Sequence, residues 1–258
     1  MGRIIAVANQ KGGVGKTTTS INLAACLAEK GKKVLAVDMD PQGNLTSGLG
    51  IDKNTLEYTI YHAMSGEINI GECMIVHPLE HGLDLSVLPA NRDLAGAEVE
   101  LVDVEDPQHI LKNLLKSVKK KYDFIIIDCP PALGMLTINS MTAADTVLVP
   151  IQCEFFALDG LSQLIYTINL IKKKLNKSLE IEGVVFTMYD ARTNLSLEVV
   201  ENVKNNLDQF IYKTIIPRNV RLAEAPSFGL PINLYDSRSS GAQDSPRSEE
   251  RFSRNAET

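Results

Sequence analysis

The feature that most constrains this 258-residue chain is a glycine-rich loop placed between a strand pattern and a helix pattern. An apolar run at residues 4–8 leads into the loop at residues 9–15, and a helical pattern covers residues 16–30. The glycines let successive backbone N–H groups turn inward on an anion, and the helix adds the positive end of its dipole. The segment therefore predicts a phosphate-binding loop at the start of an α/β domain.

The loop reads NQKGGVGKTT and departs from the strict phosphate-loop pattern GxxxxGK[ST] at one position, where Gln10 replaces the first glycine. In this pattern Lys16 reaches the β- and γ-phosphates, and the Thr17 hydroxyl ligates Mg²⁺. The residues predicted to cradle the phosphates are Gly12, Gly13, Val14, Gly15, Lys16, Thr17 and Thr18.

Continuous apolar strands alternate with helical patterns along the chain, which favours a sheet buried on both faces. The class predicted is α/β, with a doubly wound, mainly parallel sheet and helices on both faces. The expected strands lie at residues 4–8, 34–37, 83–88, 124–127, 147–151, 184–188 and 211–216. The expected helices lie at residues 16–30, 107–121, 158–175 and 195–208, the last with Asn194 as its N-cap.

Residues 1–236 are predicted to form a single domain. In residues 237–258 Ser, Arg, Glu and Asp dominate, and Phe252 is the only large apolar side chain. This segment buries too little apolar surface to offset the entropy of ordering it, so we expect a disordered tail.

Composition excludes several classes of protein. Hydrophobic residues make up 44% and charged residues 22%, which is ordinary globular usage, and the formal net charge of −6 gives no general attraction to nucleic acid. DNA contact therefore requires a local basic patch.

The four cysteines lack zinc spacing, so we expect no metal cluster. No signal peptide or run of about 18 apolar residues is present, so we expect a cytoplasmic protein with no membrane span.

Carboxylates follow two of the expected strands. Asp38 and Asp40 end the strand at 34–37, and Asp128 ends the strand at 124–127. Carboxyl ends of parallel strands form the edge where ligands bind in such sheets. The position of Asp128 after four apolar residues predicts a carboxylate that holds Mg²⁺ through a water.

KGGVGKTT resembles the deviant Walker A motif of the ParA/MinD class of ATPases, with Lys11 at the position of its signature lysine. The resemblance implies that Lys11 crosses to the nucleotide of a second subunit, so that a homodimer encloses two ATP molecules. The DMDPQGN segment resembles switch I, in which Asp40 orients the attacking water and Asp38 supports the metal site. The DCPPALG segment from Asp128 to Gly134 resembles switch II, in which Gly134 would leave a pivot.

The segments IPRNVRLAEAPS and YDSRSSGA near the end of the chain, together with QCE and DARTN, resemble the Soj-type ParA chromosome-partition proteins over residues 2 to about 243. This implies that Pro217, Asn219 and Met188 contact the adenine. It also implies that an ATP dimer binds DNA without sequence preference, that a ParB-type partner stimulates slow ATP hydrolysis, and that the protein associates with the nucleoid. The DNA-binding residues in matching motifs are Arg192, Arg218 and Arg221.

Three alternatives use the same fold. A MinD-like membrane switch requires a C-terminal amphipathic helix, and residues 244–258 have no apolar face. An iron–sulfur carrier requires a cysteine ligand set, and only Cys129 lies beside a predicted site residue. A small-molecule phosphotransferase requires a substrate pocket in place of Lys11. The chain also departs from the family after Ala242, where QDSPRSEERFSR replaces the expected last helix.

Overall fold

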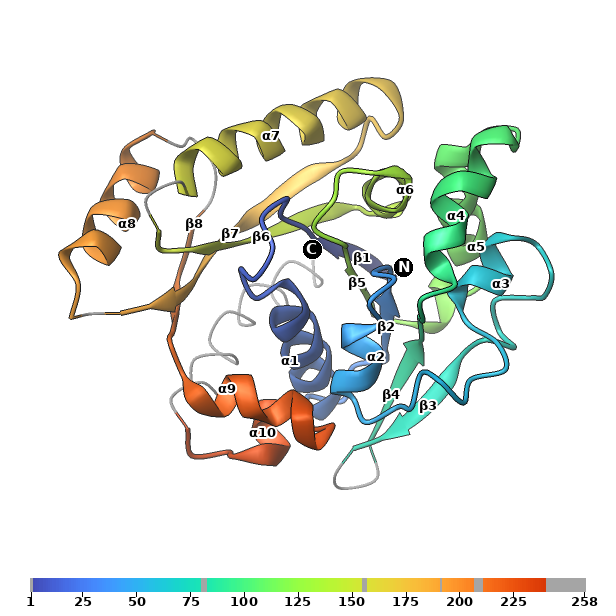
Figure 1. Cartoon of the computed structure of the whole chain (residues 1–258), viewed down its shortest axis with the longest axis horizontal. Coiled ribbons are helices and arrows are strands. Elements are labelled where there is room, and N and C mark those ends of the chain that lie inside the picture. Colours follow the sequence, from blue (N-terminus) through green and yellow to red (C-terminus); the bar gives the residue numbers. More distant parts are fainter. Residues whose placement is uncertain (1, 80–82, 155–156, 191, 207–210, 240–258) are drawn as a thin grey trace.

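A central sheet organises the computed structural model, which describes residues 2–79, 83–154, 157–190, 192–206 and 211–239 (Figure 1). Within these residues the sheet has eight strands in the order β3-β4-β2-β5-β1-β6-β7-β8. Neighbouring strands are parallel except β3 and β4, which are antiparallel. The strands are β1 Arg3–Val7, β2 Val34–Asp38, β3 Ile75–Pro78, β4 Asp84–Leu88, β5 Phe124–Asp128, β6 Thr146–Gln152, β7 Glu180–Tyr189 and β8 Ile211–Pro217.

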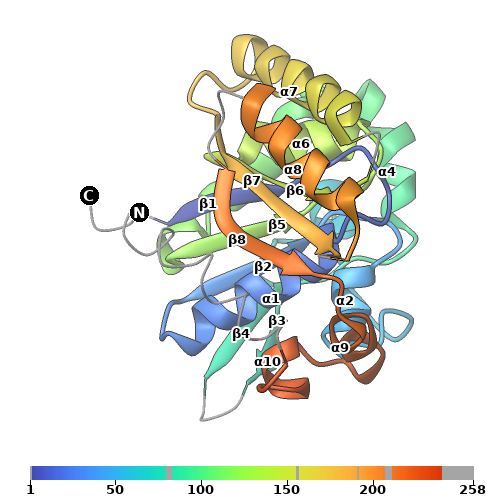
Figure 2. The same ribbon diagram turned by 90° about the vertical axis from the view of Figure 1, so that its left-hand side faces the viewer.

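Helices cover both faces of the sheet (Figures 1 and 2). One face carries α1 Lys16–Glu29, α2 Asn44–Gly48, α9 Val220–Glu224 and α10 Ile232–Tyr235. The other face carries α3 Ile60–Met64, α4 Leu94–Glu100, α5 Ile110–Lys116, α6 Met135–Ala143, α7 Ala157–Lys174 and α8 Asn194–Asn206. The predicted doubly wound, mainly parallel α/β fold is confirmed.

Alternate residues of the central strands enter two separate apolar cores. In β5, Ile125 and Ile127 pack into the core beneath α6 and α7, whereas Phe124 and Ile126 pack into the core beneath α1. All four side chains are fully buried. The continuous apolar run that predicted this strand thus reflects burial on both faces, as expected for a parallel sheet.

Two helix predictions differ from the structure. The segment expected as one helix over residues 107–121 is a 3₁₀ turn at Pro107–His109, then α5, then a second 3₁₀ turn at Lys119–Lys121. Lys119 turns out of the helical path to pair with Asp145, with Nζ 2.8 Å from Oδ2. The expected N-cap Asn194 is instead the first residue of α8, so it lies inside the helix.

The predicted C-terminal tail is only partly within the described residues. Ser237 to Ser239 form a turn in which Arg238 and Ser239 donate backbone N–H groups to Asp236. Residues 240–258, and residues 207 and 208 of the helix expected at 195–208, lie outside the described part of the chain.

The carboxyl ends of β1, β2 and β5 meet at one edge of the sheet. Asp128 at the end of β5 is level with Val7 on one side and with Asp38 on the other. The loop after β1 and the two acidic segments are therefore neighbours because the strand order places β5 between β1 and β2.

Candidate nucleotide site

The predicted phosphate loop has the backbone conformation that its glycines suggested. Gly13 and Gly15 have φ angles of 74° and 86°, in the left-handed region that only glycine adopts readily. The third glycine of the loop, Gly12, does not have a positive φ. Two buried side chains hold the loop in place: Asn9 donates to the Pro150 carbonyl at 2.7 Å, and Thr187 donates to the Val14 carbonyl at 2.8 Å.

Lys16 lies inside this loop rather than in solvent. Its side chain is buried, and Nζ donates to the backbone carbonyl of Lys11 at 3.1 Å. Burial lowers the pKa of Lys16, and the nearby carboxylates of Asp128 and Asp40 oppose that shift. A buried ammonium held against a glycine-rich loop at the start of a helix is suited to an anionic phosphate.

The side chain of the predicted signature lysine, Lys11, is more exposed than that of Lys16. The Lys11 ammonium forms an ion pair with Glu154, which follows β6, and both side chains are about two-fifths exposed, at 40% and 44%. Exposed ion pairs of this kind contribute about 0–1 kcal/mol. The Lys11 side chain is therefore able to leave Glu154 at little cost.

Asp128 is fully buried, and both of its oxygens accept hydrogen bonds from α1. Thr17 Oγ1 donates to Oδ2 at 2.7 Å, and Ser20 Oγ donates to Oδ1 at 3.0 Å. Burial, reinforced by the adjacent Asp38, raises the pKa of Asp128 to about 8. A carboxylate in this position is stabilised by a bound cation, because the cation restores the charged form.

Asp38 and Asp40 shape the segment after β2. Asp38 Oδ2 accepts from the Thr46 hydroxyl at 2.7 Å and from its N–H at 2.9 Å, and burial raises the pKa of Asp38 to about 6. Asp40 is also buried, and its Oδ1 accepts from the Gln42 N–H at 2.9 Å. The structure thus places Asp38 in the interior, where it holds the first turn of α2. Asp128 instead binds Thr17 and Ser20 of α1, the helix that directly follows the phosphate loop.

Thr17 and Asp128, which are in direct contact, offer a suitable pair of oxygen ligands for Mg²⁺. This ion binds few protein oxygens and keeps phosphate and water ligands. The described residues contain no group of three or more His, Cys, Asp or Glu arranged to hold a metal by themselves. All four cysteines are buried free thiols. These observations fit a metal held jointly with a nucleotide, and they give no support to the iron–sulfur alternative within the described residues.

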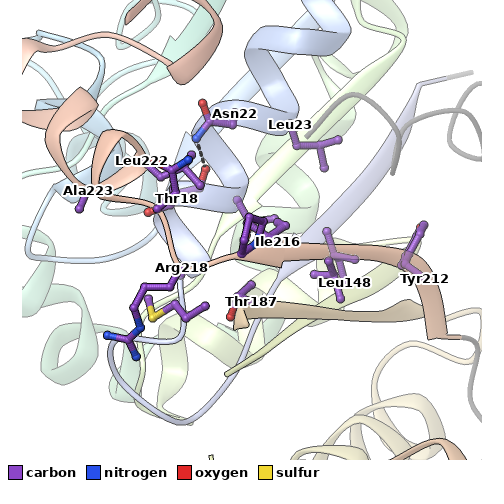
Figure 3. Close-up of a pocket in the computed structure, with 16 residues that line it drawn as sticks. Thr18, Asn22, Leu23, Leu148, Thr187, Tyr212, Ile216, Arg218, Leu222 and Ala223 are labelled. Atoms are coloured by element: carbon purple, nitrogen blue, oxygen red, sulfur yellow. Dashed lines mark hydrogen bonds between the residues drawn. The ribbon is translucent and has the colours of Figure 1, made fainter. Parts of the chain in front are cut away.

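A cavity of about 270 Å³ opens beside the phosphate loop (Figure 3). It is bounded by the loop and α1 on one side and by β7, β8 and α9 on the other. Its inner end is mainly apolar, with Leu23, Leu148, Val185 and Tyr212 among the lining residues. A mainly apolar cavity of this size next to a phosphate loop is suited to a nucleotide base.

All three predicted base contacts line this cavity. Met188 has a φ of 52°, a left-handed conformation uncommon for a residue with a side chain, and the β7–β8 register shifts at this point. Pro217 ends β8 opposite Tyr189. Asn219 accepts the N–H of Arg221 at 2.7 Å and so caps α9.

Two of the three predicted DNA-binding arginines, Arg192 and Arg221, form ion pairs with carboxylates. Arg192 is exposed and forms a bidentate ion pair with Asp190, at 2.8 and 2.6 Å. The hydrogen bonds from Arg192, together with the charge of Arg218, lower the pKa of Asp190. Figure 3 shows the Arg218 side chain pointing away from the apolar end of the cavity. Arg221 pairs with Glu224 at 3.0 Å.

Several side chains that complete the site were missed by the sequence analysis. Ser20, one turn after Thr17, holds Asp128, while Thr187 and Tyr212 come from distant strands. Only Ser20 had a local signal, because it is a polar residue on the same helix face as Thr17. The strand order brings Thr187 to the loop and Tyr212 to the cavity.

Comparison with known proteins agrees with this geometry. Residues 2–181 match the model of a family described as an AAA domain. The chain is 56% identical over 243 residues to the sporulation initiation inhibitor protein Soj of Bacillus subtilis, covering 94% of this chain and 95% of that protein. It is 52% identical to the chromosome partitioning protein ParA of Myxococcus xanthus, covering 94% and 85% of the two chains.

The chain belongs to the Soj/ParA family of chromosome-partitioning ATPases. The predicted resemblance is therefore confirmed.

Solved structures extend the similarity of this Soj/ParA protein to related enzymes. A cobyrinic acid a,c-diamide synthase from Mycobacterium smegmatis, solved with an ATP analog and magnesium, is 36% identical with a TM-score of 0.88, covering 99% of this chain and 95% of that chain. The cell division ATPase MinD of Pyrococcus furiosus is 28% identical with a TM-score of 0.79, covering 99% and 100% of the two chains. No helix among the described residues is long and apolar enough to cross a bilayer.

Proposed function

We propose that this Soj/ParA-family chain is an ATP-dependent switch of chromosome or plasmid partition. It binds ATP with Mg²⁺, forms a homodimer, binds double-stranded DNA without sequence preference, and hydrolyses ATP slowly until a ParB-type protein stimulates it. We expect it in the cytoplasm, associated with the nucleoid. The observation that carries the proposal is the juxtaposition of Lys16, the Thr17–Asp128 pair and the apolar cavity at one edge of the sheet.

The nucleotide would lie along this edge. Its phosphates would accept hydrogen bonds from the loop at Gly12, Gly13, Val14, Gly15 and Thr18, and the Lys16 ammonium would meet the terminal phosphates. Its base would enter the cavity against Met188 and Pro217, with Asn219 at the rim. Thr17 and Asp128 would hold Mg²⁺, with Asp38 supporting them from behind, and the ion would neutralise charge on the phosphate oxygens.

Two side chains would act in hydrolysis. Asp40 is buried beside Asp38 and would orient the attacking water. Lys11 would leave Glu154 and reach the triphosphate of the partner subunit, where a second cation stabilises charge that develops as the phosphate leaves. Hydrolysis would then depend on dimerisation, because the cation comes from the other chain.

DNA binding by Arg192, Arg218 and Arg221, as proposed here, would have a cost. Arg192 and Arg221 are each paired with carboxylates, so contact with a phosphate requires exchange of one anion for another. A single subunit would therefore gain little from about three contacts. A dimer with about six contacts would gain enough to bind at low salt, so that dimerisation controls the affinity for DNA.

The test is salt-dependent binding of the wild-type protein to a fluorescent duplex of arbitrary sequence, with ATP, with ADP and without nucleotide. Between about 50 and 200 mM salt, about six contacts predict a roughly 2,000-fold loss of affinity, and about three contacts predict a roughly 40-fold loss. We expect the steep dependence only with ATP. Equal binding in all three nucleotide states would contradict the proposal.

A further inference from the structure

Glu98 in α4 contacts the first turn of α6, although Met135 lies 37 residues after it in the sequence. This turn directly follows the switch II segment, defined here as residues 129–134. Its two carboxylate oxygens accept the first two N–H groups of α6: Oε2 from Met135 at 3.3 Å and Oε1 from Leu136 at 3.2 Å. Its neighbours Val99 and Glu100 are exposed, whereas Glu98 is half-buried. The side chain therefore turns inward from α4 onto the start of α6.

The first turn of a helix leaves N–H groups without an intrahelical partner, and a serine, threonine or aspartate at the N-cap commonly satisfies them. The N-cap of α6 is Gly134, which has no side chain to do so. The cap is supplied instead by another helix. A negative charge at this end of α6 is also favoured by the helix dipole.

The lack of a side chain at Gly134 leaves room for this carboxylate. A Cβ atom at position 134 would lie 2.4 and 2.6 Å from the two oxygens of Glu98, far inside van der Waals contact. The φ of Gly134 is −85°, which any residue adopts, so conformational freedom does not require glycine here. Close approach of the Glu98 side chain therefore gives Gly134 a steric role here, and its role as a pivot stays a prediction.

The opposite end of the switch II segment is also held. Asp128 is bonded to Thr17 and Ser20, and the Cys129 N–H donates to the Val7 carbonyl at 3.2 Å. The five residues between these anchors, 130–134, include Pro130 and Pro131, which stiffen the chain. The course of the segment past the phosphate site is therefore set by its two ends, and Glu98 fixes the second of them.

We propose that Glu98 is a positioning residue for ATP hydrolysis: by joining the start of α6 to α4, it sets the switch II segment at the distance from the phosphate loop that the ATP-dependent step requires. The inference rests on the proposed nucleotide-dependent switch. It assigns Glu98 no contact with nucleotide, so binding of ADP, which lacks the γ-phosphate, does not depend on it.

The test compares Glu98→Ala with the matched variant Glu100→Ala on the same helix, whose carboxylate accepts from Tyr61 Oη at 2.9 Å at the surface. For Glu98→Ala we expect ADP affinity within about twofold of wild type. ATP hydrolysis and ATP-dependent dimerisation should fall about tenfold or more, because small displacements of reacting groups have effects of that size. Glu100→Ala should keep wild-type hydrolysis. Normal hydrolysis by Glu98→Ala would overturn the inference.

A second variant separates positioning from simple capping. In Glu98→Ala combined with Gly134→Ser, the new serine occupies the space that the carboxylate leaves and caps α6 itself. We expect this double variant to recover thermal stability while its hydrolysis stays low, because α6 is no longer joined to α4. Recovery of hydrolysis together with stability would show that Glu98 is only a cap and would overturn the inference. Failure of the wild-type protein to hydrolyse ATP would instead contradict the proposed function.

Discussion

Replacing Asp128 with asparagine should stabilise the nucleotide-free protein while it damages the magnesium site. Burial raises the pKa of this carboxyl from its ordinary 3.8 to about 8. Because the folded state binds the proton more tightly than the unfolded state, stability falls as the pH rises from about 4 towards 8. Asparagine has no charge to bury, and its amide can still bond with the hydroxyls of Thr17 and Ser20.

The size of the effect follows from the pKa difference, at about 1.4 kcal/mol per pKa unit. Keeping Asp128 costs the folded state about 3 kcal/mol at pH 6 and about 5 kcal/mol at pH 8. The stability gap between Asp128→Asn and wild type should therefore widen by about 2 kcal/mol over this range. For a chain of this size that is a difference in Tm of about 4–8 °C.

The assay is thermal unfolding of nucleotide-free wild type, Asp128→Asn and the control Asp84→Asn, an exposed carboxyl, at pH 6 and pH 8. We expect the gap to widen with pH for Asp128→Asn only. With Mg²⁺ and ATP the order should reverse, since the cation stabilises the charged carboxylate of the wild type. A gap that is constant between pH 6 and pH 8 would refute the reasoning.

Three further variants test the proposed roles. Lys16→Ala should abolish nucleotide binding, measured with fluorescent ATP, because it removes the buried cation of the loop; affinity within tenfold of wild type would contradict that role. Asp40→Ala should bind ATP and accumulate on DNA as a dimer without turnover, and a normal steady-state rate of phosphate release would remove Asp40 from the mechanism. Arg192→Glu combined with Arg221→Glu should lose DNA binding while it keeps ATP-dependent dimerisation, so retention of DNA at about 50 mM salt would argue against this surface.

The strands and the phosphate loop could be predicted because their signals are local. The apolar run at residues 124–127 reflects the burial of those same positions. The glycines at 13 and 15 reflect the left-handed backbone at those positions. The short edge strand β3 escaped prediction because its exposure alternates and it ends at Pro78, features that do not resemble the buried central strands.

Contacts between elements that are distant in the sequence could not be predicted, because they depend on how the chain folds together. Thr187 reaches the phosphate loop from β7, and Glu98 reaches α6 from α4, with no signal at either position in the sequence. Met188 was placed at the base cavity only through its resemblance to the family, and its left-handed backbone has no local cause such as glycine. The sequence thus specified the chemistry of the site, while the topology specified which distant side chains support it.

Association of the turnover-blocked protein tests the central claim most directly. Sedimentation velocity of Asp40→Ala should show a dimer with ATP and a monomer with ADP or without nucleotide, and Asp40→Ala combined with Lys11→Ala should remain a monomer with ATP although it still binds the nucleotide. If Asp40→Ala loaded with ATP sediments as a monomer, or if loss of Lys11 leaves the dimer intact, the cation supplied by the second subunit is not what links nucleotide to assembly.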